Sequence, residues 1–342
     1  MPQLLTDVDA NSVVEGFQAC LIHAGGEQIS IVGGARGNGT SVAESDVYSV
    51  YCAGKPLLAV AVLAACSRGL INLRGPIAED LLPKWACGTT VEQVLTHTAG
   101  LEALHPVLTR FVAPATRDEL VREMVAPERQ DYRRSASYSA YAGWHILGKQ
   151  LERACGCSVE EALRFLVLEP YDLLGLCGLS GNVSSHVQPN AWRSTSGDLP
   201  LWGEVYGPGR SESNAALGYY ASALGLARFY HSVLDDIGGA NRVLSSDIAL
   251  TATMPNAGGF SAVLGRGSEF GLGFMTCLTR QGIDDLVGPN SFGHTGEGGG
   301  CIGFGDRDSG IAGCLLLTRL DDDIESVRFR RQRVVEALIR GF

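Results

Sequence analysis

Residues 48–67, which read YSVYCAGKPLLAVAVLAACS, decide how this chain is interpreted. Beyond Lys55 nearly every residue of this stretch is apolar, and Gly69 follows it, so we expect a helix that is buried on every face. Cys52 lies at the start of this helix, and Pro56 suits its first turn. Residues three apart share a helix face, so Lys55 can reach the thiol of Cys52. Because the free N–H groups of a helix start favour a thiolate, the segment is compatible with a cysteine nucleophile and a lysine base. Taken alone, a cysteine in such a pattern is more often a buried structural residue.

Patterns typical of strands occur at both ends of the chain, and patterns typical of helices lie between them. Residues 16–23 and 28–32 flank the turn AGGE and predict a hairpin. Later strands are expected at 271–277, 291–294, 300–304 and 311–318, before a final helix at 325–339. Helical spacing also occurs at 90–97, 144–154 and 219–234. We therefore expect a sheet domain formed by residues 1–68 and 240–342, with a mostly helical domain, 69–239, inserted into it.

Composition and charge limit the functions to consider. The chain has 342 residues, 45% of them hydrophobic and 19% charged, which is typical of a compact globular protein. The formal net charge is −10, so a nucleic-acid partner is not expected, because phosphate binding needs a basic patch. The densest basic group is in the last predicted helix, and we expect it to be a solvated face. Its members are Arg328, Arg330, Arg331 and Arg333.

The first twenty residues carry acidic side chains and lack a long apolar stretch, which does not fit a signal peptide. The longest apolar run, residues 56–66, is far shorter than the roughly 20 residues that a spanning helix needs. We expect a soluble, cytoplasmic protein without a membrane partner. The ten cysteines are expected to be reduced. Neither they nor the seven dispersed histidines show metal-ligand spacing, so we expect no metal and no cofactor.

Two further segments carry chemistry-bearing side chains. Residues 137–141 read SYSAY, and residues 292–300 read FGHTGEGGG. Taken alone, a tyrosine before a helix is more often a packing residue, and a glycine-rich HTG is more often a tight turn. His97, in the stretch THTAG, is expected to be structural.

In this order and spacing, the three segments resemble the serine β-lactamase and penicillin-binding-protein family, especially its class C and esterase-like branch. That family carries S-x-x-K at a helix start, then Y-x-N, then K-T-G or H-x-G on a strand. The corresponding residues here are Cys52–Lys55, Tyr138–Ala140 and His294–Gly296. The stretches LTHTAGL (95–101) and FGLGF (270–274) also resemble family segments. The resemblance covers residues 16–340.

The resemblance implies an α/β (α+β) fold, with an antiparallel sheet flanked by helices and a mostly helical domain beside it. The site would lie in the groove between them. Cys52 would be the nucleophile, Lys55 the general base, and Tyr138 the residue that passes a proton to the leaving group. His294, with Thr295 and Gly296, would line the sheet side and orient the substrate. The backbone N–H groups of Cys52 and Glu297 would form the oxyanion hole.

The sequence departs from the family pattern at several positions. The nucleophile is a cysteine instead of a serine, and Ala140 stands where the family has an asparagine. Tyr141 competes with Tyr138 for the role of the motif tyrosine. The carboxylate of Glu297, which follows HTG, faces either the substrate or the solvent.

A cysteine nucleophile forms a thioester, which amines attack more readily, relative to water, than they attack an oxoester. We therefore expect an acyltransferase of metabolism that moves an acyl group from an ester or carrier thioester to an amine or alcohol. The partners would be a small acyl donor and acceptor, the donor including a CoA or acyl-carrier-protein thioester. The alternatives are an esterase or amidase that hydrolyses its thioester, a non-catalytic binding member, and an engineered replacement of serine by Cys52.

Overall fold

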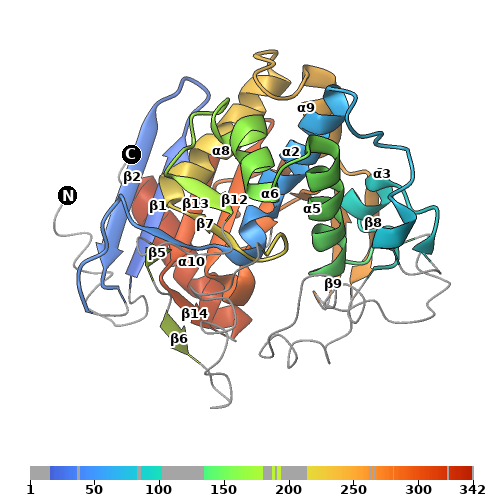
Figure 1. Cartoon of the computed structure of the whole chain (residues 1–342). Helices are drawn as coiled ribbons and strands as arrows, with labels where there is room; N and C mark the ends of the chain where they lie inside the picture. The colour runs from blue at the N-terminus through green and yellow to red at the C-terminus, as the bar shows by residue number, and fades with distance from the viewer. Residues whose placement is uncertain are drawn as a thin grey trace.

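The fold is built around one large antiparallel sheet (Figure 1). The computed structural model describes residues 16–36, 39–82, 86–101, 135–179, 187–188, 191–193, 214–261, 264, 266–279, 281–321 and 323–340. Eight strands form the sheet in the order β2-β1-β13-β12-β11-β10-β9-β8. They are β1 (Gly16–Ile22), β2 (Gln28–Gly34), β8 (Ala257–Ser261), β9 (Arg266–Phe270), β10 (Met275–Thr276), β11 (Ser291–Thr295), β12 (Cys301–Asp306) and β13 (Ala312–Leu317).

The sheet joins the two ends of the chain, as the sequence predicts. β1 and β2 form the expected hairpin, with Ala19 opposite Ile31. On its other side β1 pairs with β13, where Phe17 lies opposite Leu317. The hairpin therefore completes a sheet whose other six strands all follow residue 256.

One helix of the central part of the chain packs against the sheet. The predicted helix at 219–234 is in fact strand β7 (Tyr219–Ala221) followed by α8 (Ala223–Ile237). Ser222 separates them because its side chain accepts a hydrogen bond from the N–H of Gly225 and caps the helix. α8 contacts β1, β12 and β13, although the predicted domain boundary placed it in the helical part. The division into two domains stays a prediction.

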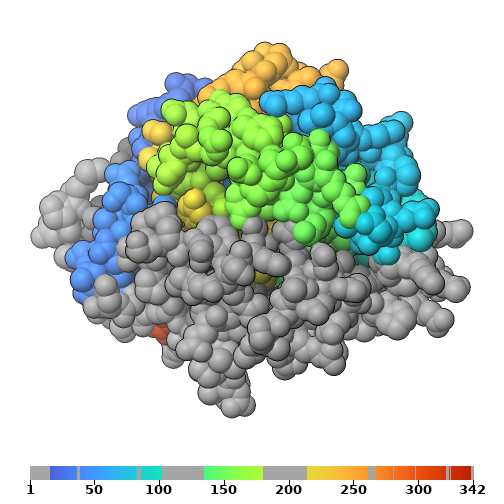
Figure 2. Space-filling model, in the orientation of Figure 1, coloured from blue at the N-terminus to red at the C-terminus, as the bar shows by residue number. Residues whose placement is uncertain are grey.

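The predicted buried helix, α2 (Lys55–Ser67), passes through the middle of the molecule (Figure 1). Every residue from Lys55 to Ala65 is buried, as its apolar pattern predicts. α2 contacts α5 (Ala142–Cys155), α6 (Val159–Leu163) and β11. In Figure 2, α5 and α6 (green) form much of the visible upper surface over it. α2 therefore lies between the sheet and the central helices, and its first residue is held between both.

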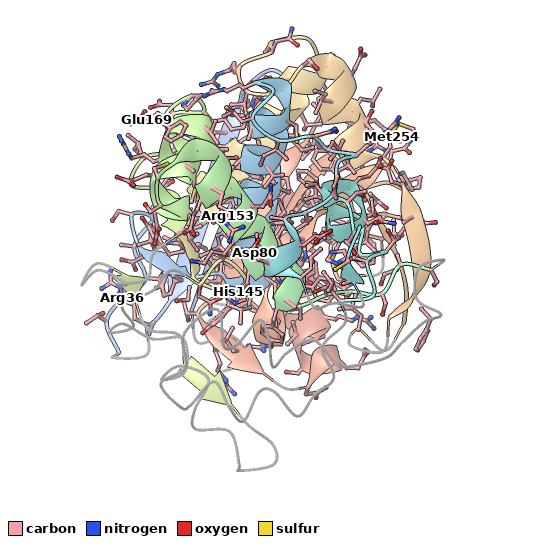
Figure 3. The ribbon with its side chains drawn as sticks, turned by 45° about the vertical axis from the view of Figure 1, so that its right-hand side comes forward. Arg36, Asp80, His145, Arg153, Glu169 and Met254 are labelled. Carbon is pink, nitrogen blue, oxygen red and sulfur yellow. The ribbon has the colours of Figure 1, made fainter. Side chains whose placement is uncertain are left out.

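Shorter elements complete the described part of the chain. β3 (Val47–Ser49) belongs to a small sheet with the order β4-β7-β3-β5, and β14 (Arg319–Asp321) pairs with β6. Arg153 near the end of α5 forms a bidentate ion pair with Asp80 of the 3₁₀ turn η2 (Glu79–Leu81) (Figure 3). Further strands and helical segments are α3 (Val91–Leu95), η6 (Arg164–Leu168), β4 (Cys177–Leu179), β5 (Val187–Gln188), β6 (Ala191–Arg193) and α9 (Ser246–Thr253).

The final helix, α10 (Ile324–Arg340), corrects one prediction. Its arginines do not form a uniformly solvated face, because Arg330 and Arg331 are buried whereas Arg328 and Arg333 are partly exposed. The buried pair hydrogen-bonds to main-chain carbonyls, which a pattern of charges along a helix does not reveal. Among the described residues, no helix combines the length and the apolar character needed to cross a bilayer. A cytoplasmic location stays a prediction.

Candidate active site

Cys52 lies in a 3₁₀ turn, η1 (Tyr51–Gly54), between β3 and α2. The turn is anchored on β7, because the N–H of Val50 donates to the carbonyl of Tyr219 at 3.0 Å. Tyr51 has φ = 49°, in the left-handed region that non-glycine residues rarely adopt. Such backbone strain is common at functional sites. Cys52 is buried, with only 6% of its surface exposed.

Lys55 connects Cys52 to the central part of the chain. Its fully buried ammonium group, Nζ, donates hydrogen bonds to Cys52 Sγ at 3.0 Å, Tyr138 Oη at 2.7 Å and the carbonyl of Ala140 at 2.7 Å. The number of these acceptors matches the three N–H groups that a protonated lysine can donate. The amine of Lys55 therefore lies within hydrogen-bond distance of both the sulfur of Cys52 and the hydroxyl of Tyr138.

The structure favours Tyr138 over Tyr141 as the motif tyrosine. Tyr138 is buried, its hydroxyl oxygen accepts from Lys55, and Lys55 Nζ also lies 4.8 Å from the centre of its ring. Tyr141 is the residue that precedes α5, and its carbonyl accepts from the N–H groups of Trp144 and His145. Ala140, which replaces the family asparagine, takes part through its main-chain carbonyl.

His294 of β11 lies on the sheet side of the site, with its ring centre 5.6 Å from that of Tyr138. Its Nδ1 is 2.8 Å from the carbonyl of Thr295, so Nδ1 carries the hydrogen. Burial, with the nearby charge of Lys55, lowers the pKa of His294 to about 3. Its buried Nε2 has no hydrogen-bond partner among the described residues and keeps a free lone pair. At neutral pH His294 thus offers a hydrogen-bond acceptor and no positive charge.

The glycine-rich segment after His294 lies against the turn that carries Cys52. A Cβ added to Gly296 would be 2.7 Å from the carbonyl oxygen of Val50, so only glycine fits there. The turn η7 (Glu297–Gly299) contacts η1. Thr295 is half-buried, and its hydroxyl points to the sulfur of Met275 at 3.9 Å. The predicted oxyanion-hole donors, the N–H groups of Cys52 and Glu297, are thus on two adjoining turns, and their joint action stays a prediction.

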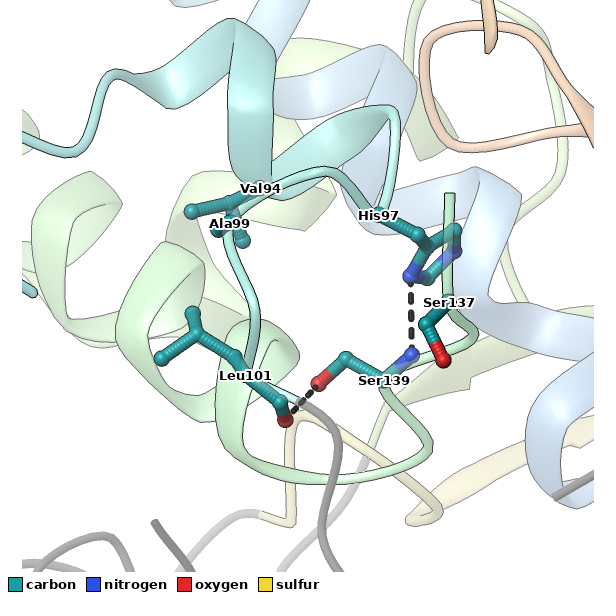
Figure 4. A pocket seen from close by; sticks show the side chains of 6 residues that line it. All are labelled: Val94, His97, Ala99, Leu101, Ser137 and Ser139. Atoms are coloured by element: carbon teal, nitrogen blue, oxygen red, sulfur yellow. Dashed lines mark hydrogen bonds between the residues drawn. The ribbon is translucent and has the colours of Figure 1, made fainter. Parts of the chain in front are cut away.

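The sequence predicts that His97 is a structural residue. In the structure it lies beside the site, next to Ser139 and Tyr138. It has φ = 58°, and its Nδ1 accepts from the N–H of Ser139 at 3.1 Å (Figure 4). Its ring lies 5.0 Å from that of Tyr138. Burial, followed by the charges of Lys55 and His294, lowers the pKa of His97 well below its usual value. His97 therefore holds the segment that presents Tyr138 and Ala140 to Lys55.

Ser139 supports the same segment from the other side. Its hydroxyl donates to the carbonyl of Leu101 at 2.9 Å and accepts from the N–H of Gly143 at 3.1 Å. The indole N–H of Trp144 donates to its carbonyl at 3.1 Å. These contacts border a small pocket (Figure 4). The residues that line this pocket are Val94, His97, Ala99, Leu101, Ser137 and Ser139.

Comparison with known proteins places the chain in a family. Residues 2–337 match the sequence model of the family described as Beta-lactamase. Esterase EstB of Burkholderia gladioli is 26% identical over 323 residues, which cover 82% of this chain and 79% of that protein.

Two solved structures show the same fold. A penicillin-binding protein homolog from Caulobacter crescentus superimposes with a TM-score of 0.79 at 18% identity, covering 100% of this chain and 96% of its own. EstCE1, described as a hydrolase with promiscuous acyltransferase activity, gives a TM-score of 0.76 at 14% identity, covering 98% and 96%. Since the family match spans nearly the whole chain and the fold agrees with it, the protein belongs to the Beta-lactamase family.

Proposed function

We propose that the protein is an acyl-transfer enzyme that works through a thioester on Cys52. The observation that carries the proposal is the buried ammonium group of Lys55, which contacts the sulfur of Cys52 and the hydroxyl of Tyr138 together. A nucleophile within hydrogen-bond reach of a group that can hold its proton is the geometry of covalent catalysis. The esterase relative EstB supports an acyl-group substrate.

In the first half-reaction the thiolate of Cys52 attacks the carbonyl carbon of an ester or thioester. A carbon–sulfur bond forms and the carbonyl oxygen becomes an oxyanion, which the N–H groups of Cys52 and Glu297 would stabilise. The oxyanion then collapses, the bond to the leaving group breaks, and Tyr138 passes a proton to that group. Lys55 replaces the proton on Tyr138 through their hydrogen bond. The product is an acyl thioester on Cys52.

In the second half-reaction an amine or alcohol attacks the thioester carbon. Its proton passes through Tyr138 to Lys55, which becomes an ammonium again, and the carbon–sulfur bond breaks so that Cys52 leaves as a thiolate beside it. Nε2 of His294 suits a contact with the acceptor, because a neutral lone pair can accept the hydrogen bond of an N–H or O–H group. Sulfur favours transfer over hydrolysis, since amines attack thioesters more readily, relative to water, than oxoesters. EstCE1, a hydrolase with promiscuous acyltransferase activity, is an example of both outcomes on this fold.

A second candidate is a hydrolase that releases the acyl group to water, which the relative named as an esterase favours. Intact-mass spectrometry separates the two. The protein is mixed with p-nitrophenyl acetate or with the acetyl thioester of N-acetylcysteamine, with and without an added amine. Transfer predicts an acetyl adduct that the amine discharges several-fold faster than water does. Equal discharge in water alone would establish the hydrolase.

Matched variants locate the adduct. Cys52→Ala should remove it, whereas Cys87→Ser with Cys277→Ser should keep it, because those two thiols are exposed and mark non-specific acylation. Cys52→Ser should form an oxoester and shift the discharge from amine toward water. An adduct that persists in Cys52→Ala would contradict the proposed nucleophile. The absence of any adduct in the parent would favour a non-catalytic binding protein.

A further inference from the structure

Arg331 of α10 is a buried cation, and two of its main-chain partners, Gly299 and Cys301, lie at the end of the glycine-rich segment beside the site. It is 3% exposed. Its Nη2 donates to the carbonyls of Gly299 at 2.7 Å and Cys301 at 3.1 Å, and its Nη1 donates to the carbonyl of Gln281 at 3.1 Å. Burying a charged group is costly unless its hydrogen bonds are satisfied. These contacts therefore tie α10 to the main chain of the turn with a directional, charge-assisted bond.

The turn that Arg331 contacts has little rigidity of its own. Gly298 has φ = 52° and Gly299 has φ = 63°, and glycine loses more conformational freedom on folding than any other residue. A Cβ on Gly299 would lie 2.2 Å from Cγ1 of Val327, so the turn packs directly on α10. Val327 and Arg331 are four residues apart and share a helix face. α10 thus holds the turn by one apolar contact and one set of hydrogen bonds.

The hydrogen bonds of Arg331 connect, through Cys301 and Gly296, to the turn that carries Cys52. The carbonyl of Cys301, which accepts from Arg331, also accepts from the N–H of Gly296 at 2.7 Å. Gly296 in turn approaches the carbonyl of Val50, two residues before Cys52. Arg331 and Gly296 therefore share one acceptor at the point where the glycine-rich turn meets η1. Movement of Cys301 would move the turn relative to Cys52.

We propose that Arg331 is a positioning residue that fixes the Glu297–Gly299 turn, so that the turn's main-chain N–H can bind the carbonyl oxygen of a substrate acylating Cys52. The role rests on the proposed function, since it acts on the acylation step. In this role Arg331 does not touch the substrate but holds the carbonyls of Gly299 and Cys301.

The test compares Arg331→Met and Arg331→Lys with Arg333→Met, a control on the same helix that removes a partly exposed ion pair with Glu336. Acylation rates are measured for a matched ester and thionoester, in which sulfur replaces the carbonyl oxygen. Losing one oxyanion donor costs about 10²–10³-fold, so a displaced turn should slow the ester by about 10–100-fold. The thionoester, which gains less from these donors, should slow by a smaller factor. Arg331→Lys should lie between Arg331→Met and the parent.

Equal slowing of both substrates, or no slowing in folded Arg331→Met and Arg331→Lys, would overturn the proposal. Alkylation of Cys52 by iodoacetamide, which forms no oxyanion, should keep the parent's rate in both variants. If the parent forms no acyl adduct, the proposed function has failed, and hydrogen exchange still tests Arg331 by itself. Exchange should then rise over residues 296–301 in Arg331→Lys and not in Arg333→Met. Unchanged exchange there would also overturn the proposal.

Discussion

Tyr138 carries the proton between Lys55 and the leaving group in the proposed reaction. Replacing it with phenylalanine removes the hydroxyl that accepts from Lys55 at 2.7 Å and keeps the ring against His97. General acid–base groups contribute typically about 10²–10⁴-fold, so Tyr138→Phe should slow acylation of Cys52 by a factor in that range. Stopped-flow release of p-nitrophenol measures it. A larger loss in Tyr141→Phe than in Tyr138→Phe would assign the role to Tyr141 instead.

Two of the buried histidines, His294 and His97, make the fold sensitive to acid. The pKa of His294 is about 3 in the folded protein against an ordinary value of 6.5, and that of His97 is lowered in the same direction, in both cases mainly by burial. As the pH falls below about 6.5, the unfolded chain binds these protons before the folded chain does. Stability should therefore be lost from about pH 6.5 downward, by up to about 1.4 kcal/mol per pH unit for each histidine.

Urea unfolding at several pH values between 7.5 and 5 measures this loss. His294→Asn and His97→Asn should each flatten the dependence of the free energy of unfolding on pH, because asparagine does not titrate. His231→Asn, which changes a partly exposed histidine of α8, is the matched control. An unaltered slope in both buried-site variants would show that other groups cause the acid sensitivity.

At the scale of elements, close packing against β7 fixes the position of the turn η1. Gly54 has no room for a side chain, since an added Cβ would lie 2.2 Å from Cβ of Tyr219. Overpacking of this kind costs about 1–3 kcal/mol, so Gly54→Ala should lower the free energy of unfolding by that amount. It should also slow acylation, because Gly54 lies between Cys52 and Lys55, and a shift of the turn would change the distance between their side chains.

Gly25→Ala is the control for this change. Gly25 lies in the β1–β2 turn, and an added Cβ there meets nothing within 4 Å. Thermal unfolding and the acylation rate are measured for both variants. If Gly54→Ala matched Gly25→Ala in stability and rate, close packing of η1 on β7 would not be needed to align the site.

At the scale of the whole molecule, Gln18 joins segments that are far apart in the sequence. It is 1% exposed in β1. Its amide nitrogen donates to the carbonyls of Ala43 at 2.7 Å and Asp46 at 3.0 Å, and its amide oxygen accepts from the N–H of Ala223 at 3.0 Å. Ala223 is the first residue of α8, so the side chain of Gln18 forms hydrogen bonds both with the first N–H group of that helix and with carbonyls of the loop that leads to β3.

Gln18→Leu should destabilise the fold by about 1–3 kcal/mol, because it leaves these buried main-chain groups without their partner. The folded enzyme should keep its acylation rate, since Gln18 contacts none of the site residues described above. Gln28→Leu, at an exposed position of β2, is the matched change on the surface. Equal stability of the two variants would show that solvent or other groups replace the contacts of Gln18.

The sequence by itself determined the features that depend on neighbours along the chain. The apolar pattern of residues 55–65 predicts a buried helix, and the spacing of three places Lys55 beside Cys52, where the structure has Nζ and Sγ 3.0 Å apart. The hairpin of β1 and β2 also follows from local patterns. Periodicity and turn chemistry encode such features, because each depends on residues that are only a few positions apart.

Only the tertiary structure decided the contacts between distant segments. Tyr138 meets Lys55 across 83 positions, and His97 meets Ser139 across 42. The sequence leaves Tyr138 and Tyr141 as alternatives, because no local pattern states which hydroxyl faces a side chain of another element. For the same reason the sequence predicts a solvated Arg331, whereas its carbonyl partners lie 30 to 50 positions away in the folded chain. Burial of a charge depends on acceptors that the packed fold supplies, and the helix pattern alone does not contain them.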